Sequence, residues 1–118
     1  MAIVALTTTD GYDLNIGSET LLMVVEETTS RKLFYDRKGR DAEVHSVNET
    51  LAAIKTEAGN LIEVTVGSDT IALNANKVVA IAAEGTGSKV FYAGKGFGLD
   101  EYITVEDPAT IEGLIDAL

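Results

Sequence analysis

The chain contains no cysteine and no tryptophan, and it has a single histidine, His45, and a single proline, Pro108. Without cysteine it has no disulfide bond, no thiolate metal ligand and no cysteine nucleophile. One imidazole is too little for a zinc site, which needs several His, Cys or carboxylate ligands. We therefore expect a protein that is not an enzyme and that uses no metal and no cofactor.

Long apolar runs and basic residues are also scarce. No stretch approaches the ~20 apolar residues that span a bilayer, and the N-terminus lacks the basic region of a signal peptide. Nine basic residues stand against 19 acidic ones, which gives a net charge of −10. Such a field repels phosphate backbones and anionic membranes. We expect a soluble product of a cytoplasm with no membrane contact, and nucleic acid is a disfavoured partner.

What the chain does contain is an internal repeat. Lys32-Leu33-Phe34-Tyr35 is matched by Lys89-Val90-Phe91-Tyr92, Tyr12-Asp13-Leu14-Asn15 by Ile71-Ala72-Leu73-Asn74, and His45-Ser46-Val47 by Ile103-Thr104-Val105. The offset between matched positions is 57 to 59 residues. Units of this size are marginal alone and share a core. We predict one domain over residues 1–118, made of repeats 1–59 and 60–118.

The patterning predicts several short strands and one closing helix in each repeat. Strands are expected over residues 4–8, 12–16, 20–26, 32–36, 42–46, 61–66, 70–74, 77–83, 88–93 and 99–105. Asp10-Gly11 indicates a tight hairpin. Asp107 followed by Pro108 starts the second helix, while Asn48 is the expected cap and Gly59 the expected stop of the first. The fold class is mainly β with two short helices (α+β), a duplicated β-meander plus helix with pseudo-two-fold symmetry in one compact domain.

The third strand of each repeat lacks the usual alternation of polar and apolar residues. Residues 21–25 and 78–83 are apolar on both faces, which is typical of strands buried on both sides. We expect these two strands to form the centre of the molecule.

Basic residues are concentrated in one hairpin, because five of the nine fall within ten positions. These candidate interface residues are Arg31, Lys32, Arg37, Lys38 and Arg40. One interpretation is a solvated hairpin that protects an edge strand from aggregation. The other is a docking site for an acidic partner, including the acidic surface of another copy.

The loop Gly94-Lys95-Gly96-Phe97-Gly98 matches neither a P-loop nor a dinucleotide fingerprint, because its glycines alternate and a strand follows. Lys95 and Phe97 join the candidate interface, with Phe97 acting as an anchor or folding back onto the sheet. His45 lies at the position of Ile103 in the other repeat, which favours a structural role, and no carboxylate pair stands out for catalysis.

Each repeat resembles the small β-meander proteins of the flagellar FlbD-like family. The matching residues are Leu14-Asn15 with Val47-Asn48, and Leu73-Asn74 with Val105-Glu106. Tandem arrangements of this kind are also similar to small uncharacterised proteins of tailed bacteriophages. The resemblance implies a scaffold of strands and turns and no catalytic residues.

Two functions from different classes follow as expectations. The first is a non-enzymatic structural or interaction protein of a phage virion, a capsid-associated accessory or decoration protein that contacts itself or capsid proteins and forms a homo-oligomer. It would be located in the virion after synthesis in the host cytoplasm. The alternative is a small regulatory module that binds a protein partner in a bacterial cytoplasm.

Overall fold

The computed structural model describes residues 2–37, 40–93 and 100–118. In the first repeat the elements are β1 (Ile3–Thr7), β2 (Asp13–Gly17), β3 (Leu21–Glu26), β4 (Arg31–Arg37), β5 (Arg40–Val47) and α1 (Leu51–Ala58). In the second they are β6 (Leu61–Val66), β7 (Asp69–Asn74), the 3-10 turn η1 (Ala75–Lys77), β8 (Val78–Glu84), β9 (Gly87–Tyr92), β10 (Asp100–Thr104) and α2 (Pro108–Asp116). The predicted class, mainly β with two helices, is confirmed.

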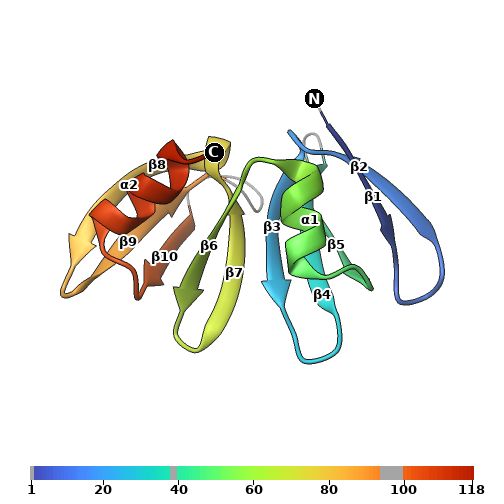
Figure 1. The fold of residues 1–118 in the computed structure, drawn as a ribbon, viewed down its shortest axis with the longest axis horizontal. Coiled ribbons are helices and arrows are strands. Elements are labelled where there is room, and N and C mark those ends of the chain that lie inside the picture. Colours follow the sequence, from blue (N-terminus) through green and yellow to red (C-terminus); the bar gives the residue numbers. More distant parts are fainter. Residues whose placement is uncertain (1, 38–39, 94–99) are drawn as a thin grey trace.

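The strands form three antiparallel sheets, and one of them crosses the boundary between the repeats. The central sheet has the order β5-β4-β3-β7-β6, so the last three strands of repeat 1 join the first two of repeat 2. The remaining strands form a pair, β1-β2, and a three-stranded sheet, β10-β9-β8. Figure 1 shows β1 and β2 at one end of the elongated molecule and the β8–β9 hairpin at the other, along an axis of 42 Å.

The two repeats match position by position, down to irregularities. The β3–β4 ladder shifts between Leu21 and Met23, and the β8–β9 ladder shifts between Val78 and Ala80. Glu49 Oε1 accepts a hydrogen bond from the Thr7 N–H at 2.8 Å, and Glu106 Oε1 accepts one from the Thr65 N–H at 2.8 Å. These contacts set an offset of 58 residues for β1 and β6 and 57 for every later element.

This offset corrects two of the matches expected from the sequence. Ile3 pairs with Gly17 and Leu61 with Asn74, so Asn74 corresponds to Gly17 and not to Asn15. His45 faces Leu33 just as Tyr102 faces Val90, so His45 corresponds to Tyr102 and not to Ile103. Short apolar repeats with one-residue differences in turn length are easy to align out of register, and the ladders settle the alignment.

The helix ends follow from local chemistry. The Asp107 carboxylate accepts the Thr110 N–H at 2.8 Å. A hydrogen bond donated by the Thr110 hydroxyl, followed by the one from this N–H, lowers the pKa of Asp107. Gly59 ends α1 with φ 75°, a left-handed conformation that glycine adopts without strain. The prediction of Asn48 as the first N-cap is wrong, because the Thr50 hydroxyl accepts the Ala53 N–H.

Two apolar clusters form the core, one for each repeat. The first gathers Val4, Leu6, Ile16, Leu33 and Ile54 with neighbours from α1 and β3. The second gathers their counterparts on β6, β7, β9 and α2, together with Met23 from the first repeat. Because Leu61 and Ala72 of repeat 2 belong to the first cluster, each repeat contributes to the core of the other.

Of the two strands expected at the centre, only β3 is there. Leu21, Leu22, Met23 and Val24 are all buried. Leu21 and Val24 belong to the first cluster and Met23 to the second, while β4 and β7 pair with the two edges of β3. The prediction for residues 78–83 is wrong. In the described chain β8 pairs with β9 alone, and most of its residues are exposed. None of the helices in these described ranges is long and apolar enough to cross a membrane.

Candidate interaction surfaces

The most unusual surface of the molecule is the strand β8. Its first six residues, Val-Val-Ala-Ile-Ala-Ala, carry no charge, and Val79 leaves 57% of its surface exposed. Soluble proteins generally protect such edges with charged residues, proline or a covering element, because an open row of N–H and C=O groups pairs readily with another strand. An apolar, unprotected edge of this kind is typical of an interaction site.

The opposite end of the molecule carries a second open edge, on β2. Within the described residues this strand pairs only with β1. The β1–β2 hairpin has one face in the core, through Val4, Leu6 and Ile16, and a second face that is exposed at Ile3, Ala5 and Asn15. Ile3 leaves 57% of its surface in solvent. The two ends of the molecule therefore each present a strand with one edge unpaired in the described chain, and an exposed branched apolar side chain.

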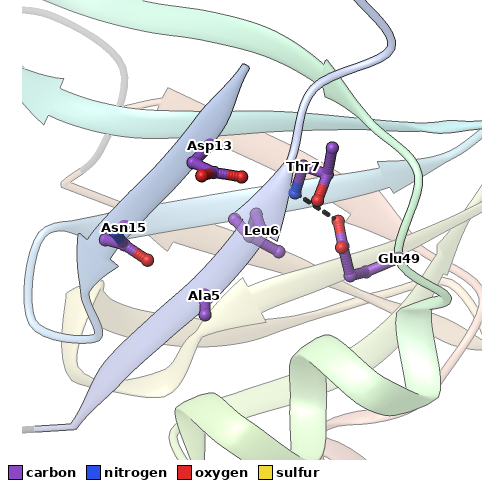
Figure 2. Close-up of a pocket in the computed structure, with 6 residues that line it drawn as sticks. All are labelled: Ala5, Leu6, Thr7, Asp13, Asn15 and Glu49. Atoms are coloured by element: carbon purple, nitrogen blue, oxygen red, sulfur yellow. Dashed lines mark hydrogen bonds between the residues drawn. The ribbon is translucent and has the colours of Figure 1, made fainter. Parts of the chain in front are cut away.

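A shallow hollow of about 420 Å³ lies on the exposed face of this hairpin. Figure 2 shows its lining residues, Ala5, Leu6, Thr7, Asp13, Asn15 and Glu49. The Glu49 carboxylate points at the β1 backbone and accepts the Thr7 N–H, as the dashed line marks. Glu106 makes the matching hydrogen bond in repeat 2, so the Glu49 carboxylate has a structural role, which is to hold the strand β1.

The basic hairpin is only partly a free surface. Arg31 has a side chain that is 14% exposed, and its guanidinium donates to the Glu49 and Asn48 carbonyls and pairs with Glu26 at 3.0 Å. Lys32 is half-exposed and lies 3.9 Å from Glu27. Arg31 thus ties β4 to the start of α1, and it is committed to the fold.

Some of the other predicted interface residues lie outside the part of the chain that the structure describes. Arg37 and Arg40 face each other across the β4–β5 ladder, at the end of both strands. Lys38 lies outside the described residues, as do Lys95 and Phe97 of the Gly94–Gly98 loop. The docking role of this set stays a prediction.

His45 has partners that the sequence did not indicate. Its ring stacks on Tyr35 with the centroids 5.8 Å apart and the planes 7° from parallel. Its Nε2 lies 3.4 Å from the Tyr35 hydroxyl and 3.7 Å from a Glu43 carboxylate oxygen. At the same positions in repeat 2, Tyr92 and Tyr102 meet edge to face at 6.0 Å. An aromatic pair is thus built into each repeat, which supports a structural role for the histidine.

Tyr92 links the two repeats directly. Its hydroxyl donates to the Leu22 carbonyl on β3 and accepts the Asn74 N–H at 3.1 Å. Burial raises the pKa of Tyr92 and raises that of Tyr102 to about 12, with the nearby Asp100 carboxylate adding to the effect on Tyr102. Both hydroxyls therefore stay protonated and act as hydrogen-bond donors at neutral pH.

No cluster of three or more His, Asp or Glu side chains suited to a metal ion occurs in the described part of the chain. No protein-family model, curated protein or solved structure gives a significant match to the sequence.

Sequence reasoning selected charged and loop residues as the candidate surface, and it missed the two open strand edges. The apolar pattern of residues 78–83 predicts a strand buried on both faces, whereas most of β8 is exposed. A signal was present in the topology, because a duplicated unit that pairs with its neighbour leaves one edge unpaired at each end of the pair.

Proposed function

We propose that the chain is a non-enzymatic structural protein that acts through protein–protein contacts, as a capsid-associated accessory or decoration protein of a phage virion. One observation carries the proposal: β8, whose first six residues are apolar, lies at one end of the molecule with an edge that no strand of the described chain pairs with. In an assembly this edge gains backbone hydrogen bonds and loses apolar surface to the partner, which favours association.

The polar groups that chemistry would need are engaged in holding the fold. Arg31 binds the carbonyls that precede α1, Glu49 holds the β1 backbone, and His45 stacks on Tyr35. At β8 the described part of the molecule offers an unpaired strand edge and an exposed apolar side chain, Val79. These are features through which proteins bind other proteins.

The virion assignment is tested by quantitative mass spectrometry of phage particles purified from the source culture. We expect peptides of this chain in a fixed ratio to the major capsid protein after density-gradient purification. Recovery of the chain only outside the particles, with a single cellular protein bound, would replace the virion role by that of a cytoplasmic regulatory module.

The role of the edge is tested with a matched pair of substitutions. Val79→Asp places a charge on β8, whereas Val105→Asp places one at a valine that is similarly exposed, 62%, but lies outside any strand. We expect the first to reduce incorporation into particles at least tenfold and the second to leave it unchanged. Equal incorporation of both variants would contradict a role for β8.

A further inference from the structure

The junction between the two repeats shows how one unit binds the next. On β3, Met23, Val24 and Val25 pair antiparallel with Leu73, Ala72 and Ile71 on β7. The junction is sealed by polar contacts, since the Asn74 amide donates to the Leu21 carbonyl at 2.7 Å and the Tyr92 hydroxyl donates to the Leu22 carbonyl. It is a complete strand-to-strand interface within the chain.

The first helix completes this junction from above. Leu61, at the start of β6, belongs to the same apolar cluster as Ala58 of α1, and it is 3% exposed. Lys55 of α1 lies 3.6 Å from Glu63 of β6. The helix of repeat 1 therefore covers one end of the outer face of the hairpin that opens repeat 2.

Each strand of this junction has a counterpart in the other repeat, and in the described chain that counterpart has no strand paired at the matching edge. By the 57-residue offset β8 corresponds to β3, and β2 corresponds to β7, and in the described chain β8 pairs only with β9 and β2 only with β1. Leu22 is 1% exposed, whereas its counterpart Val79 is 57% exposed. Leu61 is 3% exposed, whereas its counterpart Ile3 is 57% exposed. These two exposed apolar residues thus occupy positions that the internal junction buries.

We infer that β8 of one copy pairs antiparallel with β2 of a second copy, repeating the β3–β7 junction between chains. This inference deepens the proposed function, on which it rests for its setting, by naming a second copy of the chain as a partner. The offset fixes the register: Ala80 opposite Ile16, Ile81 opposite Asn15, and Ala82 opposite Leu14.

The same superposition fills the exposed face of the β1–β2 hairpin. Ile115 of α2 corresponds to Ala58, so α2 of one copy would cover Ile3 of the next, beside the hollow that Ala5 and Asn15 line. Ile115 is half-buried in the single chain and belongs to the rim of the second cluster. Both the open edge and the uncovered hairpin face therefore gain a cover from a single contact.

This contact is heterologous, because it joins two different surfaces. Pairing of β8 with β8 in a two-fold dimer would leave β2, Ile3 and the hollow uncovered, and it has no precedent within the chain. Head-to-tail pairing leaves one β8 and one β2 free at the ends of each dimer, so further copies add until a ring closes or a filament grows.

Cysteine cross-linking tests the register, and the chain has no native cysteine to interfere. Leu14→Cys and Ala82→Cys are made in separate chains, mixed in equal amounts and oxidised with diamide. Directly opposed residues on paired strands have Cβ atoms about 4.5–5.5 Å apart, close enough for a disulfide after small adjustments. We expect the mixed disulfide, identified by mass, to exceed either homodimer at least tenfold.

Two controls bracket this measurement. Val25→Cys with Ile71→Cys in one chain places thiols at the matching positions of the internal junction, and it should form an intramolecular disulfide. Leu14→Cys mixed with Ala83→Cys shifts the register by one residue and turns the second thiol to the other face, so it should cross-link poorly. Asn15→Cys with Ile81→Cys is a second in-register pair, for use if Leu14→Cys lowers folding yield.

The outcomes separate the inference from the proposed function. Predominant Ala82→Cys homodimers, or no disulfide for either in-register pair while the internal control forms its own, would overturn the head-to-tail junction. If the chain is nonetheless found in purified particles, the virion role stands without this junction. A mixed disulfide from a chain that is absent from particles supports the junction and rejects the virion role.

Discussion

The strands β3 and β8 occupy the same place in two copies of one unit, share an apolar run that ends in a glutamate and a bulge at the same position, and have opposite environments. The strand β3 is buried because the chain continues into a hairpin, β6–β7, that pairs with its edge. No strand of the described chain other than β9 pairs with β8, so its second edge stays open. The burial of a strand is thus decided by what comes next in space, and only partly by its own residues.

The largest expected effect is the difference in stability between an Asp substitution at Leu22 and one at its counterpart Val79. Leu22→Asp buries a carboxylate at a position that is 1% exposed, and it should cost about 4 kcal/mol or more, enough to prevent folding. Val79→Asp should change the stability of the dilute monomer by less than about 0.5 kcal/mol. Urea denaturation followed by circular dichroism measures both. Similar losses for the two variants would show that β8 is buried in the single chain.

A smaller effect is expected at the turn between β8 and β9, where the repeats differ. Gly87 corresponds to Ser30, and a Cβ at Gly87 would clash with the backbone carbonyl of Thr104. We expect Gly87→Ala to destabilise by about 2–3 kcal/mol, because the clash is with main chain that has to shift. Gly113→Ala, in α2 with nothing near the added methyl, should stabilise by about 0.5–1 kcal/mol. Thermal melts of both variants measure the difference. A change in stability of the same sign in both variants would contradict this account.

The tyrosine that joins the repeats gives the third contrast. Tyr92→Phe leaves the Leu22 carbonyl and the Asn74 N–H without their buried partner, which should cost about 2 kcal/mol. Tyr35→Phe should cost less than about 1 kcal/mol in the dilute monomer, because the Tyr35 ring is only half-buried there. Chemical denaturation below the concentration of self-association compares the two. Equal losses for the two variants would contradict the role of Tyr92 in joining the repeats.

The smallest expected effect is a loss of stability at alkaline pH that arises in repeat 2. The pKa of Tyr102 rises to about 12 in the folded chain, against about 10 when unfolded. The unfolded state therefore loses this proton first, and stability that is complete below pH 10 declines as pH rises toward 12. Partial exposure limits the loss at pH 11 to about 1 kcal/mol or less. Denaturation at pH 9 and pH 11 should show the decline, and Tyr102→Phe should reduce it. An unchanged decline would assign the effect to other groups.

Much of the fold was accessible from the sequence because it is encoded locally. Asp107 followed by Pro108, and Gly59 after an apolar stripe, marked helix ends through the hydrogen bonds and dihedral angles that these residues favour. The duplication fixed the number of strands and helices per unit. The first N-cap was misassigned by two residues, because Asn48 and Thr50 are both good caps and only the path of the chain decides between them.

The candidate surfaces were much less predictable, for a physical reason. An uncharged strand has the same sequence whether it is covered by its own chain or by another molecule, so residues 78–83 were assigned to the interior. Arg31 looked like part of a docking patch because its neighbours are basic, whereas its guanidinium reaches backbone carbonyls 17 and 18 residues away. Contacts of that kind depend on tertiary geometry, which no local pattern encodes.

Amide hydrogen exchange measured as a function of protein concentration tests most directly the claim that β8 and β2 are two halves of one junction. At low concentration, amides of β3 and β7 should exchange slowly, while the outward-facing amides of β8 and β2 exchange fast. As concentration rises, we predict that β8 and β2 become protected together, with the same midpoint. Protection of β8 without β2, or exchange at both strands that is independent of concentration up to the millimolar range, would contradict the account.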